Sequence, residues 1–260
     1  MKTAIGFFGL SMALCVSTCL AAGITVPAGA GLNLGGGQLA AAGGDLLIGG
    51  TLQLGAGEVV GLRNFTVAGG GQGSLGSGQI ELFGDWSNAG TILPGSSLMR
   101  FVDGALASSS VLGATTFASV SFVSANGKRY LFQSGQTQTV SNALAIQGTQ
   151  ALPIQFDVTN PGNVANINLL PTGTQAIQYV GVSDVHATGQ HLASNQDNDG
   201  GRGNATGWFR TLAAPYMAVP GVTPWSLLML LLAMGMLAWR QIQSRNNGIT
   251  HTTSNNSSEV

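Results

Sequence analysis

The sequence predicts an all-β fold, a Gly-rich right-handed parallel β-helix or solenoid, with a hydrophobic segment at each end of the chain. Glycine supplies 40 of the 260 residues, against a usual share of about 7%. Charged residues make up only 7% and hydrophobic residues 44%, so burial and not ion pairing has to hold the fold. Short apolar segments alternate with glycine through the middle of the chain, which indicates strands and turns.

The N-terminal residues have the layout of a secretory signal peptide. Lys2 is followed by an apolar run that reaches Leu20 and then by small residues. A basic start, an apolar middle and a small-residue end are typical of a segment that is removed on export. We expect residues 1–22 to be this signal, with cleavage after Ala21 or Ala22.

Both cysteines of the chain, Cys15 and Cys19, lie in that segment. A mature chain without them has no disulfide and no thiolate metal site. A lipoprotein signal is an alternative, because Val16, Ser17 and Thr18 precede Cys19 much as in a lipidation motif. Threonine is a poor residue directly before such a cysteine, so we favour the cleaved signal.

The strands of the first half are short and show period-two alternation between glycines. They are expected at Leu32–Leu34, Leu46–Ile48, Thr51–Leu54, Phe65–Val67 and Gln79–Leu82. Strands this short cannot bury a face alone, so they have to stack on one another, as the rungs of a parallel β-helix do. Glycine at the corners supplies the positive φ values that tight turns need.

The second half contains longer strands and clearer turns. They are expected at Phe117–Val123, Lys128–Phe132, Gln136–Ile146, Ile154–Val158, Val164–Leu170 and Ala176–Val182. A β-sandwich is the alternative architecture, but it favours hairpin signals at intervals of about 8 to 12 residues. Few Asn-Gly or Asp-Gly pairs are present, so we favour the β-helix.

A second apolar run covers residues 222–239 and contains no charged residue. Its length, about 18 residues at 1.5 Å per residue, suffices for a bilayer core. Trp225 and Trp239 stand at its ends and Arg240 and Arg245 follow it, an arrangement typical of membrane-interface anchors with the basic side in the cytoplasm. A buried globular helix is the alternative, but such a helix normally carries a polar stripe, which is missing here.

These observations divide the chain into five segments. We expect a signal peptide at 1–22, an exported domain at 23–210, a linker at 211–221, a transmembrane or sorting helix at 222–239 and a polar cytoplasmic tail at 240–260. Within the exported domain, residues 23–115 form the Gly-rich rungs, and residues 116–210 form the longer strands and a cap.

The segment from Val219 to Leu228, followed by the apolar run and Arg240, resembles the IPTL-CTERM sorting signals of Gram-negative bacteria, relatives of the PEP-CTERM signals. The residues that carry the resemblance are Val219, Pro220, Thr223, Pro224 and Trp225. The family usually has Thr and Leu where this chain has Gly221 and Val222, an acidic residue before the tryptophan, and no polar tail. The resemblance implies sorting by an exosortase-type peptidase, and a plain membrane anchor is the alternative.

The exported domain resembles filamentous-haemagglutinin-like and other bacterial surface β-helix proteins. The segments that carry this likeness are Gly84–Thr91, Phe117–Val120, Gln138–Val140, Tyr179–Asp184 and Gly207–Phe209. It implies an adhesin-like or scaffold role for a protein in the inner membrane with a periplasmic domain, or finally at the cell surface.

One loop has the residue pattern of a calcium site. Asn195, Asp197 and Asp199 place side-chain oxygens at alternate positions ahead of Gly200, as a loop that wraps Ca²⁺ requires. The first ligand is Asn and not Asp, and Thr206 stands at the twelfth position, where a bidentate Glu belongs. We therefore favour a solvated glycine-rich loop, and expect no other cofactor.

Other side chains are weaker candidates for chemistry. Asp184, His186 and His191 include the usual metal ligands and proton carriers, but they follow no metal-binding spacing. Trp86 and Trp208 are the tryptophans of the exported domain and offer rings for sugar stacking. For Trp208 we favour a role in capping the end of the coil together with the next residue, Phe209.

Charge and motif content narrow the function. Between Gly23 and Arg210 there are six basic and nine acidic residues, which argues against nucleic acid as a partner. No nucleophile elbow is present, and we expect no groove in which three or more ionisable side chains meet. We therefore expect a non-catalytic structural or interaction protein whose partners are the membrane, a sorting peptidase and extracellular polysaccharide. A carbohydrate-binding adhesin and a β-helix polysaccharide-active enzyme are the alternatives.

Overall fold

The computed structural model describes residues 23–210 and the helix α1 (Pro224–Thr250). The chain divides into two units at Thr211, and each unit is described by itself. The expected signal peptide at 1–22, the linker at 211–221 and the last ten residues lie outside the described residues.

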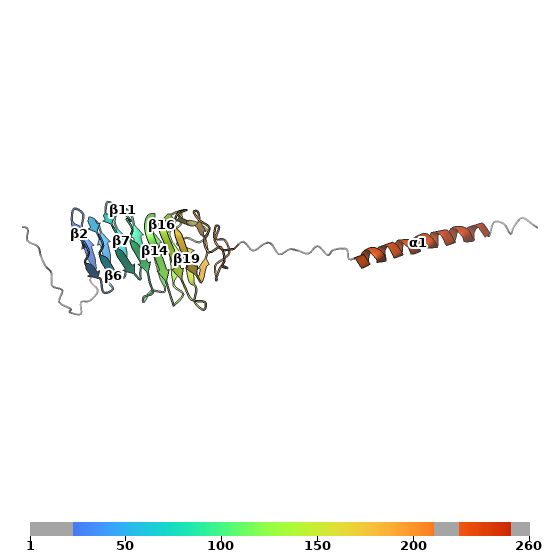
Figure 1. Cartoon of the computed structure of the whole chain (residues 1–260), viewed down its shortest axis with the longest axis horizontal. Helices are drawn as coiled ribbons and strands as arrows, with labels where there is room; N and C mark the ends of the chain where they lie inside the picture. The colour runs from blue at the N-terminus through green and yellow to red at the C-terminus, as the bar shows by residue number, and fades with distance from the viewer. Residues whose placement is uncertain (1–22, 211–223, 251–260) are drawn as a thin grey trace, which may run out of the picture. The chain divides into compact units, whose positions relative to one another are not determined.

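Residues 23–210 form a parallel β-solenoid of 21 strands (Figure 1). Every pairing between these strands is parallel. Sheet 1 contains β1 (Ile24–Val26), β4 (Leu46–Ile48), β7 (Phe65–Val67), β10 (Trp86–Asn88), β13 (Ser108–Leu112), β15 (Arg129–Phe132), β17 (Ile154–Val158) and β20 (Val180–Val182). Sheet 2 contains β2 (Gly31–Asn33), β5 (Thr51–Gln53), β8 (Gln72–Ser74) and β11 (Thr91–Leu93). Sheet 3 contains β3 (Gln38–Ala40), β6 (Glu58–Leu62), β9 (Gln79–Leu82), β12 (Leu98–Phe101), β14 (Thr115–Val123), β16 (Thr137–Gln147), β18 (Ala165–Leu169) and β21 (Val185–Ala187), and β19 (Thr174–Gln178) pairs with β16.

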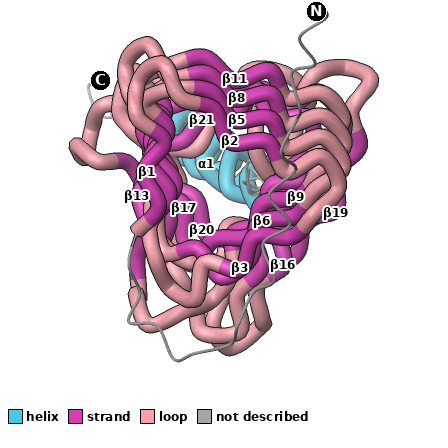
Figure 2. Tube along the Cα trace, turned by 90° about the vertical axis from the view of Figure 1, so that its left-hand side faces the viewer, coloured by secondary structure: helices cyan, strands magenta, loops and turns pink. Residues whose placement is uncertain are grey.

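Each of the first turns visits the three sheets once, so equivalent strands of successive turns lie side by side (Figure 2). Gly31 pairs with Thr51 and Thr51 with Gln72, which makes one turn about 20 residues long. This stacking explains how strands of three residues are stable, because each strand is covered by the strands of the neighbouring turns.

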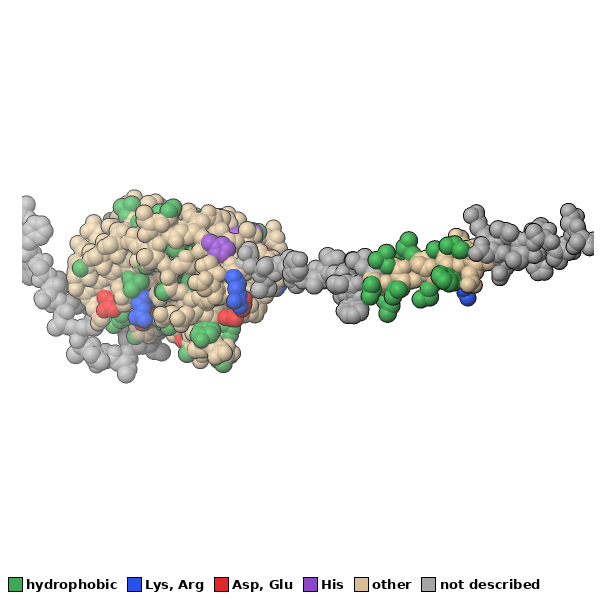
Figure 3. Space-filling model, turned by 45° about the vertical axis from the view of Figure 1, so that its right-hand side comes forward, with side chains coloured by type: hydrophobic (Ala, Val, Ile, Leu, Met, Phe, Trp, Pro, Cys, Tyr) green, Lys and Arg blue, Asp and Glu red, His purple; other side chains and the backbone are tan. Residues whose placement is uncertain are grey.

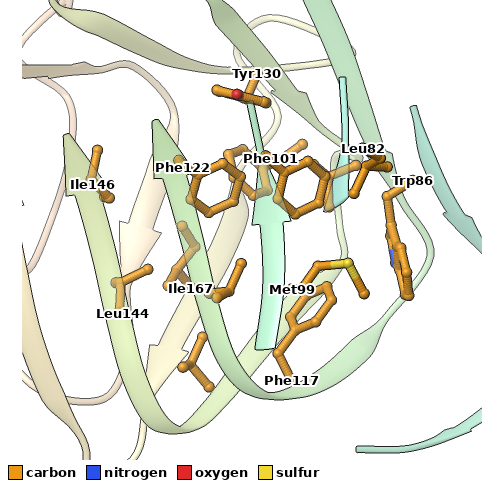
Figure 4. Packing of buried hydrophobic residues seen from close by; sticks show 14 of the residues in the cluster. Leu82, Trp86, Met99, Phe101, Phe117, Phe122, Tyr130, Leu144, Ile146 and Ile167 are labelled. Atoms are coloured by element: carbon orange, nitrogen blue, oxygen red, sulfur yellow. The ribbon is translucent and has the colours of Figure 1, made fainter. Parts of the chain in front are cut away.

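The core follows from the period-two alternation of the strands. In β4, Leu46 and Ile48 are fully buried, whereas Leu47 between them points outward. Aromatic rings of successive turns stack in the core: the centroids of Phe65 and Trp86 are 4.8 Å apart. Those of Phe101 and Phe122 are 4.7 Å apart (Figure 4). Dispersion between such rings adds to the hydrophobic stabilisation.

Glycines occupy one corner of the coil in every early turn. Gly55, Gly76 and Gly95 all have positive φ. A Cβ on any of them would lie 2.2 to 2.3 Å from the carbonyl oxygen of the glycine one turn earlier. The corner therefore needs glycine both for its backbone conformation and for the close approach of successive turns.

The coil changes its cross-section after β12. Strands β14 and β16 have 9 and 11 residues and run through the position of sheet 2 into sheet 3. Their pairing shifts register between Phe117 and Ser119, which lets the strands bend around a corner. Beyond β16 the two positions separate again, because β18 pairs with its first half and β19 with its second.

These findings confirm the all-β fold and the solenoid architecture, and the β-sandwich alternative is wrong, because all pairings are parallel. The right-handed sense stays a prediction. The single strand expected at Ala176–Val182 is two strands, β19 and β20, because Tyr179 adopts a positive φ of 54° and interrupts the extended backbone.

Helix α1 begins at Pro224 and ends at Thr250. The expected helix at 222–239 thus starts two residues later and continues well into the expected tail at 240–260. No proline or glycine stands between Arg240 and Asn247, so nothing in the sequence stops the helix there. Among the described residues, no helix combines the length and the apolar character that a bilayer crossing needs.

Candidate functional site

Residues 189–210 fold over the last turn of the solenoid, and we call them the C-terminal cap. Trp208 and Phe209 are buried at the end of the core, and Trp208 forms a parallel bridge with Leu192. The Trp208 ring lies 6.2 Å from Phe156 and 5.7 Å from Phe209. The expected capping role of Trp208 and Phe209 is confirmed.

Side-chain amides of the cap pair with backbone groups at the last strand edges. Asn198 accepts a hydrogen bond from the Val182 N–H (2.8 Å) and donates one to the Val182 carbonyl (2.9 Å). Asn204 accepts one from the Asp184 N–H (2.9 Å). The Asn198 amide stands where the peptide groups of a further strand would stand, so it closes the edge of sheet 1 at Val182, and Asn204 pairs with the turn that follows β20.

A charged group joins the cap to the turns below it. Nη2 of Arg202 is 2.7 Å from Oδ1 of Asp157 and 3.8 Å from Oδ2 of Asp184. Asp184 also accepts hydrogen bonds from the Gly162 N–H and the Asn204 amide. Three ionisable side chains thus meet where the cap joins the turns below it, and about half of the Arg202 side chain is exposed. None of the three lines the groove described below, and the contacts of both carboxylates join the cap to the turns below it.

The two histidines of this region bind backbone carbonyls of the cap. The His186 ring lies 3.0 Å from the Asn204 oxygen, and the His191 ring contacts the Phe209 oxygen. Within the residues that the structure describes, no group of three or more His, Cys, Asp or Glu side chains could hold a metal ion.

Two of the three candidate calcium ligands, Asp197 and Asp199, have separate contacts in the structure, and Asn195 lines the groove described below. Asp197 forms a bidentate ion pair with Arg210, and the hydrogen bonds from this guanidinium lower the pKa of the Asp197 carboxyl. Asp199 bonds through its backbone to Val180. The arginine supplies at Asp197 the positive charge that a cation would supply.

Lys128 is buried and joins successive turns. Its ammonium donates to the carbonyl oxygens of Phe83 and Val102, the latter at 3.1 Å, and lies 5.6 Å from the Tyr130 ring centroid. Burial lowers the pKa of Lys128. Its contacts satisfy backbone acceptors and stabilise the stack of turns.

A groove of about 450 Å³ lies between β19, the end of β16 and the C-terminal cap. Its lining carries no charge, and most of it is amide or hydroxyl. The lining residues are Gln147, Gln175, Ala176, Ile177, Gln178, Ala193, Ser194, Asn195 and Gln196. Amides both donate and accept hydrogen bonds, so this lining matches a ligand rich in hydroxyl groups.

Two of the groove amides build the groove, and others face its space. Gln175 bonds to backbone groups of His191 and Ala193, and Gln196 donates to the Ile177 carbonyl. Gln147 and Gln178 are register partners on adjacent strands, and their side chains make no hydrogen bond within the described residues. We call Gln147 and Gln178 the amide ladder. These two residues were not identified from the sequence, because no local pattern shows that they are register partners.

The expected aromatic sugar platforms are not available. Trp86 is fully buried and stacks on Phe65, and its indole N–H donates to the Thr115 hydroxyl at 3.0 Å. Trp208 is also buried. A ligand in the groove therefore has to be held by hydrogen bonds to amides and not by stacking on tryptophan.

The remaining predicted site residues belong to the two ends of the chain. Ala21, Ala22, Val219, Pro220 and Thr223 lie outside the described residues. Pro224 and Trp225 begin α1, and Arg245 lies in its last third. Trp239 and Arg240 are exposed in α1.

Comparisons of the chain with protein-family models, with curated proteins and with solved structures give no match.

Proposed function

We propose that the chain is an exported, non-catalytic surface protein whose β-solenoid presents uncharged polar side chains to other molecules. The observation that carries the proposal is the side of the coil that Figure 3 shows, on which few charged side chains lie between the uncharged ones. A solenoid of this kind is an extended scaffold whose exposed positions can vary without disturbing the core.

Export and sorting depend on the two ends of the chain. The basic, apolar and small-residue order of residues 1–22 supports removal after Ala21 or Ala22. The likeness of Val219–Leu228 to IPTL-CTERM signals supports processing by an exosortase-type peptidase. Mass spectrometry of the protein from its native host tests both: we expect a chain that begins at residue 22 or 23 and lacks the C-terminal peptide. An intact C-terminus would leave membrane anchoring alone.

Membrane attachment is assigned to the α1 region, because large apolar side chains are exposed on all its sides. They are Leu228, Met229, Leu230, Leu231, Leu232, Met234, Met236, Leu237, Trp239 and Ile242. Such a surface is unfavourable in water. After carbonate extraction of cells we expect the chain that still carries α1 in the membrane pellet, and a chain without residues 212–260 in the supernatant. A full-length chain in the supernatant would contradict the attachment.

Carbohydrate binding is a second candidate, which the amide-lined groove favours. We expect the protein to bind a member of a panel of neutral polysaccharides and to lose binding when the amide ladder is removed by Gln147→Ala and Gln178→Ala. Gln53→Ala is the matched control, because Gln53 is also exposed on a strand but lies on sheet 2. Equal binding by both proteins, or no binding at millimolar concentration, would exclude this groove.

A further inference from the structure

The first turn of the solenoid leaves its strand edges open. Among the described residues, β1, β2 and β3 each pair on one side only and stand at the ends of their sheets. Leu32, Leu34 and Leu39 of this turn are only partly buried and pack against the core. The N-terminal end of the coil therefore presents unpaired backbone groups around an apolar centre, and we call it the open end.

The hydrogen bonds of β1 identify its unpaired groups. The Ile24 N–H donates to the Asp45 carbonyl, and the Val26 carbonyl accepts from Gly49. In a strand, the N–H and C=O of one residue point to the same side within the sheet, and those of the next residue point to the opposite side. The N–H and C=O of Thr25 therefore point away from β4, toward the open end.

The same reasoning applies to β2 and β3. The Ala30 carbonyl and the Leu34 N–H bond to the next turn, as do the Gly37 carbonyl and the Ala41 N–H. The groups that remain for a partner belong to Gly31, Asn33, Gln38 and Ala40.

The open end lacks the charged side chains that commonly block exposed strand edges in natural proteins. Residues 23–44, the whole first turn, contain no charged residue. A second copy can approach this surface without like-charge repulsion.

We propose that the open end pairs with the open end of a second copy of this chain, forming a closed head-to-head dimer. The proposal rests on the removal of residues 1–22 under the proposed function. A two-fold axis perpendicular to the coil sets one edge strand antiparallel to its own copy and exchanges the other two. A second copy fits because its three edges have the same lengths and the same spacing around the coil.

Two further observations support this partner. The C-terminal cap covers the other end of the coil, so head-to-tail filaments cannot form and the assembly closes at two chains. The first turn, residues 23–44, is also of the size that stable interfaces contribute, about 20 to 30 residues a side.

A proline at Thr25 tests the proposal. Because the Thr25 N–H faces the open end, Thr25→Pro breaks no bond to β4 but places a ring where the partner strand has to lie. We expect the chain without residues 1–22, in detergent, to have the mass of a dimer by light scattering, and the Thr25→Pro chain that of a monomer with an unchanged circular-dichroism spectrum. The melting temperature of the monomer should be lower, because dissociation removes the stabilisation that association adds. Thr66→Lys is the control: Thr66 is on the same outward line of sheet 1, two turns inside, and its dimer should persist.

Mass spectrometry of the protein from its native host separates this proposal from the proposed function. A monomeric wild-type chain that begins at residue 22 or 23, or a Thr25→Pro chain that remains a dimer, overturns the dimer while export stands. Retention of residues 1–22 overturns export. In that chain the condition on which the dimer rests fails as well, so the dimer is overturned together with export.

Discussion

The two ends of the solenoid differ in how their core and their last strand edges are covered. At the C-terminal end, Trp208 and Phe209 cover the core and the amides of Asn198 and Asn204 pair with the last backbone groups. At the open end, the edges of β1, β2 and β3 have no partner among the described residues. A coil needs its ends closed to avoid uncontrolled strand pairing, and here one closure lies within the chain while we assign the other to a second copy.

The composition of the two ends differs accordingly. The cap is rich in asparagine, aspartate and arginine, whose side chains reach backbone groups and one another. The first turn consists of glycine, alanine and aliphatic residues with few polar side chains and no charge. Polar side chains that replace a strand are therefore a sequence-level sign of a closed end, and their lack marks an end that pairs through its backbone.

The largest difference between the ends should appear in the removal of apolar side chains. Trp208→Ala should lower the free energy of unfolding by about 3–5 kcal/mol, as truncation of a buried aromatic does. Leu32→Ala at the open end should cost about 1–2 kcal/mol, because Leu32 is only partly buried. Urea denaturation measures both; equal costs would mean that the cap does not seal the core.

A glycine of the first turn and one of the third turn differ in whether the backbone of a preceding turn packs against them. Gly35 and Gly76 both have positive φ, 63° and 55°. A Cβ on Gly76 would lie 2.3 Å from the Gly55 oxygen, whereas nothing lies within 4 Å of one on Gly35. Gly76→Ala should cost about 2–4 kcal/mol and Gly35→Ala about 1 kcal/mol. Melting temperatures in the monomeric Thr25→Pro background would show the contrast, and a reversed order would refute the stacking of these corners.

The contribution of an asparagine of the cap to stability should depend on its position, because only some of these amides pair with backbone groups. Asn198→Ala leaves both backbone groups of Val182 without partners and should cost about 1–3 kcal/mol. Asn195→Ala, in the groove and exposed, should change stability by less than about 0.5 kcal/mol. Thermal unfolding with and without calcium gives a second readout. A calcium-induced rise that Asn195→Ala removes would restore the metal site that we disfavour.

The smallest effects concern the surface ion pairs near the two ends. The hydrogen bond from Arg63 lowers the pKa of Asp45, and that from Arg210 lowers the pKa of Asp197. Each carboxylate therefore stabilises the fold at pH values above its unfolded pKa of about 3.9, and this contribution is lost as the pH falls through the lowered value. Asp45→Asn should flatten the acid limb of a stability profile more than Asp197→Asn, because Asp45 also accepts hydrogen bonds from Asn64. A larger effect at Asp197 would contradict this ranking.

Much of the coil could be predicted from local pattern, because alternation within a strand is a local property. The expected segments Leu46–Ile48, Phe65–Val67, Gln79–Leu82 and Ile154–Val158 coincide with strands of the structure. The strand β8 (Gln72–Ser74) was missed, since its central residue is Gly73 and shows no alternation. Its stability comes from the strands on either side, β5 and β11.

The candidate sites could not be predicted in the same way, because they depend on which turns meet. Gln147 and Gln178 are 31 positions apart in the sequence, and only the pairing of β16 with β19 makes them register partners. Asn198 lies in the stretch whose spacing suggested calcium, yet it pairs with Val182. The spacing of oxygen-bearing residues predicted a polar loop, but it did not predict that the side chain of Asn198 pairs with the backbone of Val182.

The route by which the chain leaves the solenoid has a mechanical consequence. The last described residue of the coil is Arg210. Its backbone N–H donates a hydrogen bond to the Gln196 carbonyl, and its guanidinium forms an ion pair with Asp197. If the far end of the chain is held, tension enters the domain here. Trp208 and Phe209 would have to be drawn out of the core before β20 or any earlier turn could peel away, so resistance to pulling is concentrated in about 20 residues.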